Sequence, residues 1–245
     1  MLEEILFFVV AFISEVIGAI AGFGSSTIFL PLALFFVDFE TALIFVAISH
    51  IFGNLGRINF FRHGIDKEII ATFGIPSILF SFLGASIVGI LSQDILKVTL
   101  GAFLIIISAL FLVKPSLKVP TNRNIVMAGG GISGLITGLV GTGGALRATF
   151  LTGFNLEKTK YIATAAVIAL GTDATRIPLY LSQGFLLQHY YYYIPILAAT
   201  AIGGSYIGKK IVGKIDQNIF RKIVLIAIIL VSINFIISGG LSMSN

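Results

Sequence analysis

The chain has 245 residues, of which 57% are hydrophobic and only 11% are charged. A soluble domain carries about 25% charged residues, so this chain is too apolar to cover a water-facing surface and is predicted to be an integral membrane protein. The absence of cysteine excludes a disulfide framework and a cysteine-based metal site. The net charge of +5 does not indicate nucleic-acid binding, because the basic residues lie mostly in short loops between apolar segments, where they set membrane orientation.

The apolar runs in chain order lie at residues 5–37, 41–61, 69–91, 95–113, 125–154, 159–181, 190–208 and 219–238. A spanning helix needs about 20 apolar residues, so six of these runs are predicted to be single spans. The runs 5–37 and 125–154 are too long for one ordinary span. Each has a glycine-rich centre, at Gly22 to Ser26 and Gly141 to Gly144, where a helix is weakened. Each long run is therefore either one steep, broken helix or a hairpin of two short segments.

The basic residues favour the hairpin, because cytoplasmic loops are enriched in lysine and arginine. With eight single crossings, basic loops would fall on both sides of the membrane. With hairpins, and leaving aside three arginines within spans, Lys97 alone lies outside and twelve basic residues lie inside. Both termini are then predicted to be extracytoplasmic, and each half is a hairpin followed by three transmembrane helices. The twelve inside residues are Arg62, Lys67, Lys114, Lys118, Arg123, Lys158, Lys160, Lys209, Lys210, Lys214, Arg221 and Lys222.

The two halves of the chain repeat at an offset of 119 residues. Gly22-Phe23-Gly24-Ser25 aligns with Gly141-Thr142-Gly143-Gly144, and Asn54 and Arg57 align with Asp173 and Arg176. We expect an all-α integral membrane fold of two inverted-topology repeats, residues 1–118 and 119–245, that form one transport unit. Such repeats are typical of transporters whose site lies between the halves.

Polar groups occur within the apolar runs, at Glu15, Asn54, Arg57, Arg147, Asp173 and Arg176. A charge at the bilayer centre costs at least ~2.5–3.5 kcal/mol, so such groups usually face a cavity or one another. Three arginines against two carboxylates give a formal sum of +1, which favours an anion. Asn54 and Arg57 are three residues apart and share a helix face, as do Asp173 and Arg176. The alternative is that the arginines snorkel to the nearer interface or form structural ion pairs.

The glycine-rich breaks form the second element of the expected site. A short helix that begins after Gly24 or Gly143 presents free backbone N–H groups and a partial positive charge, which attract anions. Hydroxyl donors are added by Ser25, Ser26, Thr27 and Thr142. Other glycine pairs have the spacing of close helix packing, which is how we interpret Gly18 and Gly22, Gly134 and Gly138, and Gly204 and Gly208.

Glu15, Arg147 and Asp173 are candidates for a coupling or counter-ion role, since carboxylates carry protons in many transporters. Each carboxylate could equally be a fixed partner of an arginine. His50 aligns with Ala169, so the repeat gives it no support, and His63 falls in an inside loop. A histidine could carry protons near neutral pH, but we interpret both histidines as hydrogen-bonded structural residues.

The paired motifs resemble those of the TauE/SafE family of sulfite exporters, whose halves each open with a stretch resembling G-x-G-G-G. Here the matching segments are Gly22-Phe23-Gly24-Ser25-Ser26, followed by Pro31, and Gly141-Thr142-Gly143-Gly144-Ala145. Ser25 and Ser26 replace two glycines, and Phe150 stands where Pro31 would predict proline. The resemblance covers nearly the whole chain and implies transport of sulfite, thiosulfate or sulfonates.

We therefore expect a secondary transporter in the cell membrane that moves a small sulfur oxyanion or organosulfonate by alternating access. Its partners would be the anion, the lipid bilayer and protons as a candidate coupling ion. No metal or other cofactor is expected, and the chain has no phosphate-binding G-x-x-x-x-G-K-[ST] motif for ATP. The alternatives are a passive anion channel, or a membrane-embedded hydrolase that uses Ser25 or Ser26 with His50. The predicted substrate-binding residues are Gly22, Gly24, Ser25, Ser26, Asn54, Arg57, Gly141, Thr142, Gly143, Gly144, Asp173 and Arg176.

Overall fold

The computed structural model describes residues 2–21, 24–60, 64–115, 117, 119–211, 214 and 216–244. These residues form helices and connecting loops, and no strand occurs among them. The predicted all-helical fold is thus confirmed for the part of the chain that is described. Six helical segments of this part are long and apolar enough to cross a membrane: Phe39–Asn59, Lys67–Ile90, Gln93–Val113, Arg123–Val140, Thr159–Ser182 and Ile219–Ser242.

The first long apolar run is divided into two helices that pack against each other. Helix α1 (Leu2–Ala21) is followed by the short helix α2 (Ser26–Ala33). Between them, Gly24 has a φ of +92°, a conformation that side chains with a Cβ rarely adopt. The run is therefore a hairpin rather than one steep helix, as predicted, but α1 has 20 residues and is not one of the two short segments expected. Gly22 and Phe23 of this break lie outside the described residues.

The second long run is divided in the same way. Helix α7 (Arg123–Val140) ends at Gly141, which has a φ of +74° and caps the helix in the left-handed conformation. Helix α8 (Gly144–Thr152) begins three residues later and packs against α7. Both breaks therefore occur within the glycine-rich segments that the repeat aligns, although the left-handed glycines, Gly24 and Gly141, do not align with each other.

The remaining helices follow the predicted spans. One continuous helical segment, Lys67–Ile90, contains a π-helical turn at Ile70–Gly74. The run predicted at 190–208 is helical, but its helix falls outside the six candidate spans, and its last turn contains Lys209 and Lys210. The helices are α3 (Phe39–Phe60), α4 (Lys67–Ile69), α5 (Ile75–Ile87), α6 (Gln93–Val113), α9 (Lys158–Ser182), α10 (Tyr193–Ile211) and α11 (Gln217–Ser244).

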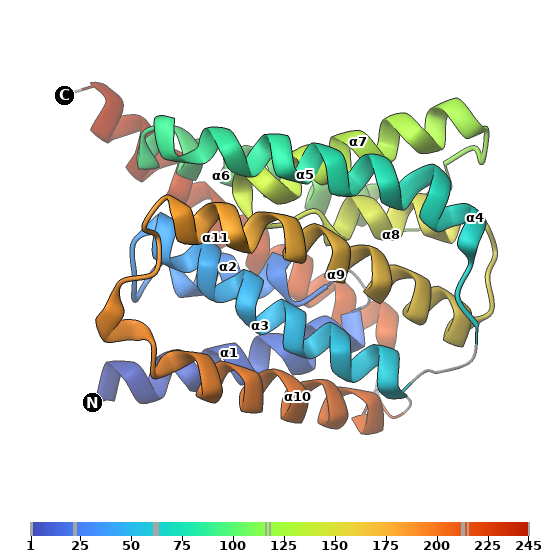
Figure 1. Cartoon of the computed structure of the whole chain (residues 1–245), viewed down its shortest axis with the longest axis horizontal. Helices are drawn as coiled ribbons and strands as arrows, with labels where there is room; N and C mark the ends of the chain where they lie inside the picture. Colours follow the sequence, from blue (N-terminus) through green and yellow to red (C-terminus); the bar gives the residue numbers. More distant parts are fainter. Residues whose placement is uncertain are drawn as a thin grey trace.

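The helices pack in pairs that join the two halves of the chain. Helix α5 packs against α7, and α10 packs against α1, while α3 packs against α9 and α6 against α11. In Figure 1 both chain termini lie at the left end of the bundle, where α1 begins and to which α2 returns. Helix α7 begins at the right end, and α8 returns to it. The two hairpins therefore enter the bundle from opposite ends.

Close glycine contacts hold α5 and α7 together. A Cβ at Gly134 would lie 2.0 Å from the carbonyl oxygen of Ser77, and one at Gly138 would lie 2.1 Å from that of Ser81. At the interface between α10 and α1, a Cβ at Gly204 would lie 2.8 Å from the Cβ of Glu15. The packing interpretation of these glycines is confirmed, because only glycine allows the backbones to approach this closely.

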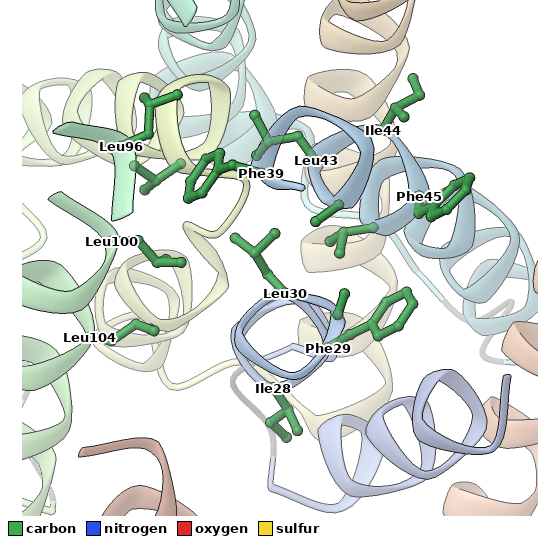
Figure 2. Packing of buried hydrophobic residues seen from close by; sticks show 14 of the residues in the cluster. Ile28, Phe29, Leu30, Phe39, Leu43, Ile44, Phe45, Leu96, Leu100 and Leu104 are labelled. Carbon is green, nitrogen blue, oxygen red and sulfur yellow. The ribbon is translucent and has the colours of Figure 1, made fainter. Parts of the chain in front are cut away.

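Helix α2 lies inside the protein rather than at its lipid-facing surface. All of its residues except Leu32 are buried. Figure 2 shows Leu30 on the side of α2 that faces Leu43 of α3 and Leu100 of α6, and all three belong to the main apolar core. This packing fixes the start of α2, and with it the first glycine break, at the centre of the bundle.

Candidate functional site

The two glycine breaks touch each other. The hydroxyl oxygens of Thr27 and Thr142 are 2.9 Å apart and hydrogen-bonded, although the residues are separated by 115 positions in the chain. A Cβ placed on Gly24 would lie 3.7 Å from the Cα of Gly144. The breaks thus form one buried polar region to which both halves contribute, as expected from the repeat.

One ionic network surrounds Glu15 of α1. The guanidinium of Arg57 donates through Nη2 to the Glu15 carboxylate, and the Ser205 hydroxyl donates to the same carboxylate oxygen at 2.6 Å. Arg57 also donates through Nη1 to Oδ1 of Asn54 at 3.0 Å, and Asn54 donates to the carbonyl of His50 at 2.8 Å. Arg57 is therefore paired with a carboxylate from another helix.

A second network surrounds Asp173 of α9. Arg176 donates through Nε to Asp173 Oδ1 at 2.9 Å, and its Nη2 lies 2.7 Å from that oxygen without hydrogen-bond geometry. His50 Nδ1 lies 2.8 Å from the other carboxylate oxygen. Arg176 Nη1 donates to the Thr137 carbonyl at 3.2 Å, near the C-terminal end of α7, where a cation is favoured. Asp173 and Arg176 are both completely buried.

Arg147 on α8 differs from the other two arginines. It is 7% exposed, and its side chain makes no hydrogen bond or ion pair with any residue that the structure describes. The charge of Arg147 interacts electrostatically with the charges of Asp173, Arg57 and Arg176. It also lies near the positive N-terminal end of α8, which disfavours a second positive charge. The charge of Arg147 is therefore left without a bonded counter-ion.

The start of α8 offers free donors beside Arg147. The backbone N–H of Arg147 donates to the Gly143 carbonyl at 3.0 Å, but those of Gly144, Ala145 and Leu146 meet no acceptor among the described residues. These are the N–H groups that a helix leaves unpaired in its first turn. Such donors together with a cationic side chain suit an anion.

The structure brings most of the predicted substrate-binding residues together. The guanidinium of Arg176 abuts the second break, since a Cβ at Gly141 would lie 3.6 Å from its Nη1. Ser25 precedes α2 without capping it through its side chain, and Ser26 is buried. Gly22 and His63 lie outside the described residues.

Sequence reasoning missed two partners in these networks. His50 pairs with Asp173 across 123 positions, and Ser205 pairs with Glu15 across 190. No sequence motif or spacing signals either pair, because the residues belong to different helices. No hydrogen bond joins His50 to Ser25 or Ser26 in the described part of the chain, so the hydrolase pairing lacks structural support. Nor do the described residues contain a group of three His, Cys, Asp or Glu side chains that could hold a metal ion.

The chain was compared with known families, curated proteins and solved structures. The family model for the sulfite exporter TauE/SafE matches residues 6–235, which is nearly the whole chain. No curated protein and no solved structure matches. With this match and its apolar helices, the chain belongs to the sulfite exporter TauE/SafE family of membrane transport proteins.

Proposed function

We propose that the protein is a secondary transporter that moves a small sulfur oxyanion or organosulfonate across the cytoplasmic membrane by alternating access. The observation that carries this proposal is Arg147, a buried cation that no described residue pairs with. A buried charge without a partner is costly, so it is retained where a ligand supplies the opposite charge. A small anion bound beside Arg147 would do so.

The surrounding charges support an anion rather than a cation. Glu15 is bonded to Arg57 and Asp173 to Arg176, so these two pairs are each neutral. Arg147 then leaves a surplus of one positive charge among groups within electrostatic range of one another. In this arrangement the paired arginines shape the site, and Arg147 supplies the net attraction.

The breaks supply directional donors for the oxygens of the anion. The second break contributes the unpaired N–H groups of Gly144 and Ala145 and the hydroxyl of Thr142. The first break contributes Ser25 and Ser26. A tetrahedral or pyramidal sulfur anion presents several acceptor oxygens, which need donors from several directions. Contributions from both halves would allow access to alternate from one side of the site to the other.

Alternating access also rests on our proposal that residues 1–118 and 119–245 are inverted repeats. The exchange of partners supports it, since α5 packs on α7 as α10 packs on α1, and the two hairpins enter from opposite ends (Figure 1). We further propose that both termini are extracytoplasmic. The first turns of α4, α7 and α9 lie at the end opposite to the termini in Figure 1, and these turns contain Lys67, Arg123 and Lys160.

A binding screen of the purified protein tests the proposed function. Sulfite, thiosulfate and methanesulfonate are added separately, and thermal stabilisation is measured against a buffer that contains only large organic anions. An anion whose concentration is one hundred times its Kd stabilises a protein with a single site by about 2.7 kcal/mol. We expect stabilisation of the wild type and of Arg123→Gln, a control at an exposed arginine, and none of Arg147→Gln. Equal stabilisation of Arg147→Gln and wild type would remove Arg147 from the site.

A further inference from the structure

His50 has one nitrogen engaged and one free. Its Nδ1 lies 2.8 Å from Asp173 Oδ2, whereas Nε2 is buried and has no hydrogen-bond partner among the described residues. Because an ionised carboxylate only accepts hydrogen bonds, neutral His50 carries its proton on Nδ1 and donates it to Asp173. Nε2 then presents a lone pair inside the protein. A structural histidine in a membrane protein would normally use both nitrogens, because an unpartnered buried polar atom is costly.

The position of His50 couples its charge to the anion site. Asp173 accepts from His50 and is also bonded to Arg176, so the carboxylate is already neutralised when the imidazole is uncharged. A proton on Nε2 would therefore add a full positive charge to the cluster, and Asp173 would stabilise it directly. Asp173 also interacts electrostatically with Arg147, which places this added charge within range of the group that holds the anion.

The other charged groups on α3 and on the helices packed against it are paired or lie near helix ends. Glu15 and Arg57 are paired with each other. Helix α2, which packs on α3, carries no titratable side chain. The remaining described titratable groups on elements packed against α3 lie near helix ends: Tyr193, Tyr206, Lys209 and Lys210 on α10, Asp94 and Lys97 on α6, and Lys160, Tyr161 and Tyr180 on α9.

We propose that His50 binds the proton that couples transport, so that protonation of His50 and binding of the anion strengthen each other. This inference rests on the proposed function. The proton comes from water on the side to which the site is open and forms an N–H bond at Nε2, which converts imidazole to imidazolium. When the site opens to the other side, this bond breaks and the proton returns to water with the release of the anion. Because linkage is reciprocal, the anion must raise the affinity of His50 for the proton by the same factor.

The two halves are unequal in this respect. His50 aligns with Ala169, and the carboxylate that pairs with the repeat arginine comes from α1 in one network and from α9 in the other. Among the described residues, a histidine side chain takes part in the network of Asp173 and not in that of Glu15, which contacts His50 through its backbone carbonyl alone. The proton-binding site therefore belongs to the Asp173 network, while the Glu15 network is a fixed ion pair.

The test measures the Kd of thiosulfate between about pH 5.5 and pH 8.5, because the charge of this probe does not change across the range in which histidine titrates. In the wild type we expect the Kd to rise with pH, by at most about tenfold per pH unit for one linked proton. His50→Gln keeps a hydrogen-bond donor but cannot titrate, so its Kd should not change with pH. His189→Gln, at an exposed histidine, should keep the wild-type profile.

A pH profile of His50→Gln equal to that of the wild type overturns this inference, as does a wild-type Kd that is independent of pH. Either result leaves the proposed function standing, whereas failure of every anion in the screen to bind overturns the proposed function itself. If His50→Gln does not fold, calorimetry of the wild type in buffers of different ionisation enthalpy decides. Uptake approaching one proton per thiosulfate supports the inference, and no uptake overturns it.

Discussion

Two arginine substitutions should change the stability of the anion-free protein in opposite directions. Arg176→Gln removes the partner of the fully buried Asp173, and breaking a buried ion pair in this way costs about 3–5 kcal/mol. Arg147→Gln removes a buried charge that has no bonded counter-ion among the described residues, so it relieves a desolvation penalty. We expect it to stabilise the protein by about 1 kcal/mol, within the range of roughly 0.5–2 kcal/mol that single stabilising substitutions commonly give.

The assay is thermal unfolding in detergent at one fixed heating rate, with large organic anions only. For a chain of this size, a change of 1 kcal/mol in the free energy of unfolding shifts the Tm by about 2–4 °C. Arg176→Gln should therefore unfold roughly 6–20 °C below the wild type, and Arg147→Gln about 2–4 °C above it. Arg123→Gln should match the wild type, because Arg123 is exposed. A loss of stability in Arg147→Gln as large as that in Arg176→Gln would show that Arg147 has a structural partner, and would refute the reasoning that assigns it to the anion.

Two further predictions concern helix packing and a loop outside the membrane spans. Gly134→Ala puts a Cβ 2.0 Å from the Ser77 carbonyl oxygen, and since ordinary contact begins near 3.4 Å, α5 and α7 must separate by about 1.4 Å. Overpacking of this kind costs about 1–3 kcal/mol. A Tm equal to that of the control Gly240→Ala, where no atom lies within 4 Å, would contradict this prediction. Lys160 forms an ion pair with Asp66 at 2.9 Å and lowers the pKa of that carboxyl. This partly exposed pair should stabilise the protein by about 0.2–1 kcal/mol at pH values above the unfolded-state pKa of Asp66, which is near 4. The contribution should be lost as the pH falls through the lower pKa that Asp66 has in the folded protein. Asp66→Asn keeps the cap of α4 but not the charge, so its Tm should lie below that of the wild type at pH 7 and meet it near pH 3; a gap that persists in acid would contradict the ionic explanation.

The sequence was sufficient to predict where the helices break and which residues share a face. Glycines at matching positions, such as Gly24 and Gly143, predict a break because glycine weakens a helix, and the structure ends one helix and begins the next around them. The spacing of Asp173 and Arg176 placed them on one helix face, and they form an ion pair there. These predictions depend only on local backbone geometry.

The partners across helices could not be predicted in this way. The hydrogen bond between Thr27 and Thr142 joins positions that the offset of 119 does not align, because it depends on how the two hairpins meet in space. His50 has no counterpart in the second half, so the repeat pointed away from its pairing with Asp173. The isolation of Arg147 is also a tertiary property, since it depends on which carboxylates the other two arginines have engaged.

The measurement that tests the central claim most directly is uptake of radiolabelled thiosulfate by proteoliposomes that contain the purified protein. We expect wild-type uptake that saturates with concentration and increases when the outside is made acidic. Arg123→Gln should retain this uptake and Arg147→Gln should lose it, because the guanidinium on α8, with which no described residue pairs, supplies the charge that binds the anion. Saturable uptake by Arg147→Gln at the wild-type rate would contradict the account, and wild-type flux that neither saturates nor responds to a proton gradient would indicate a passive channel instead.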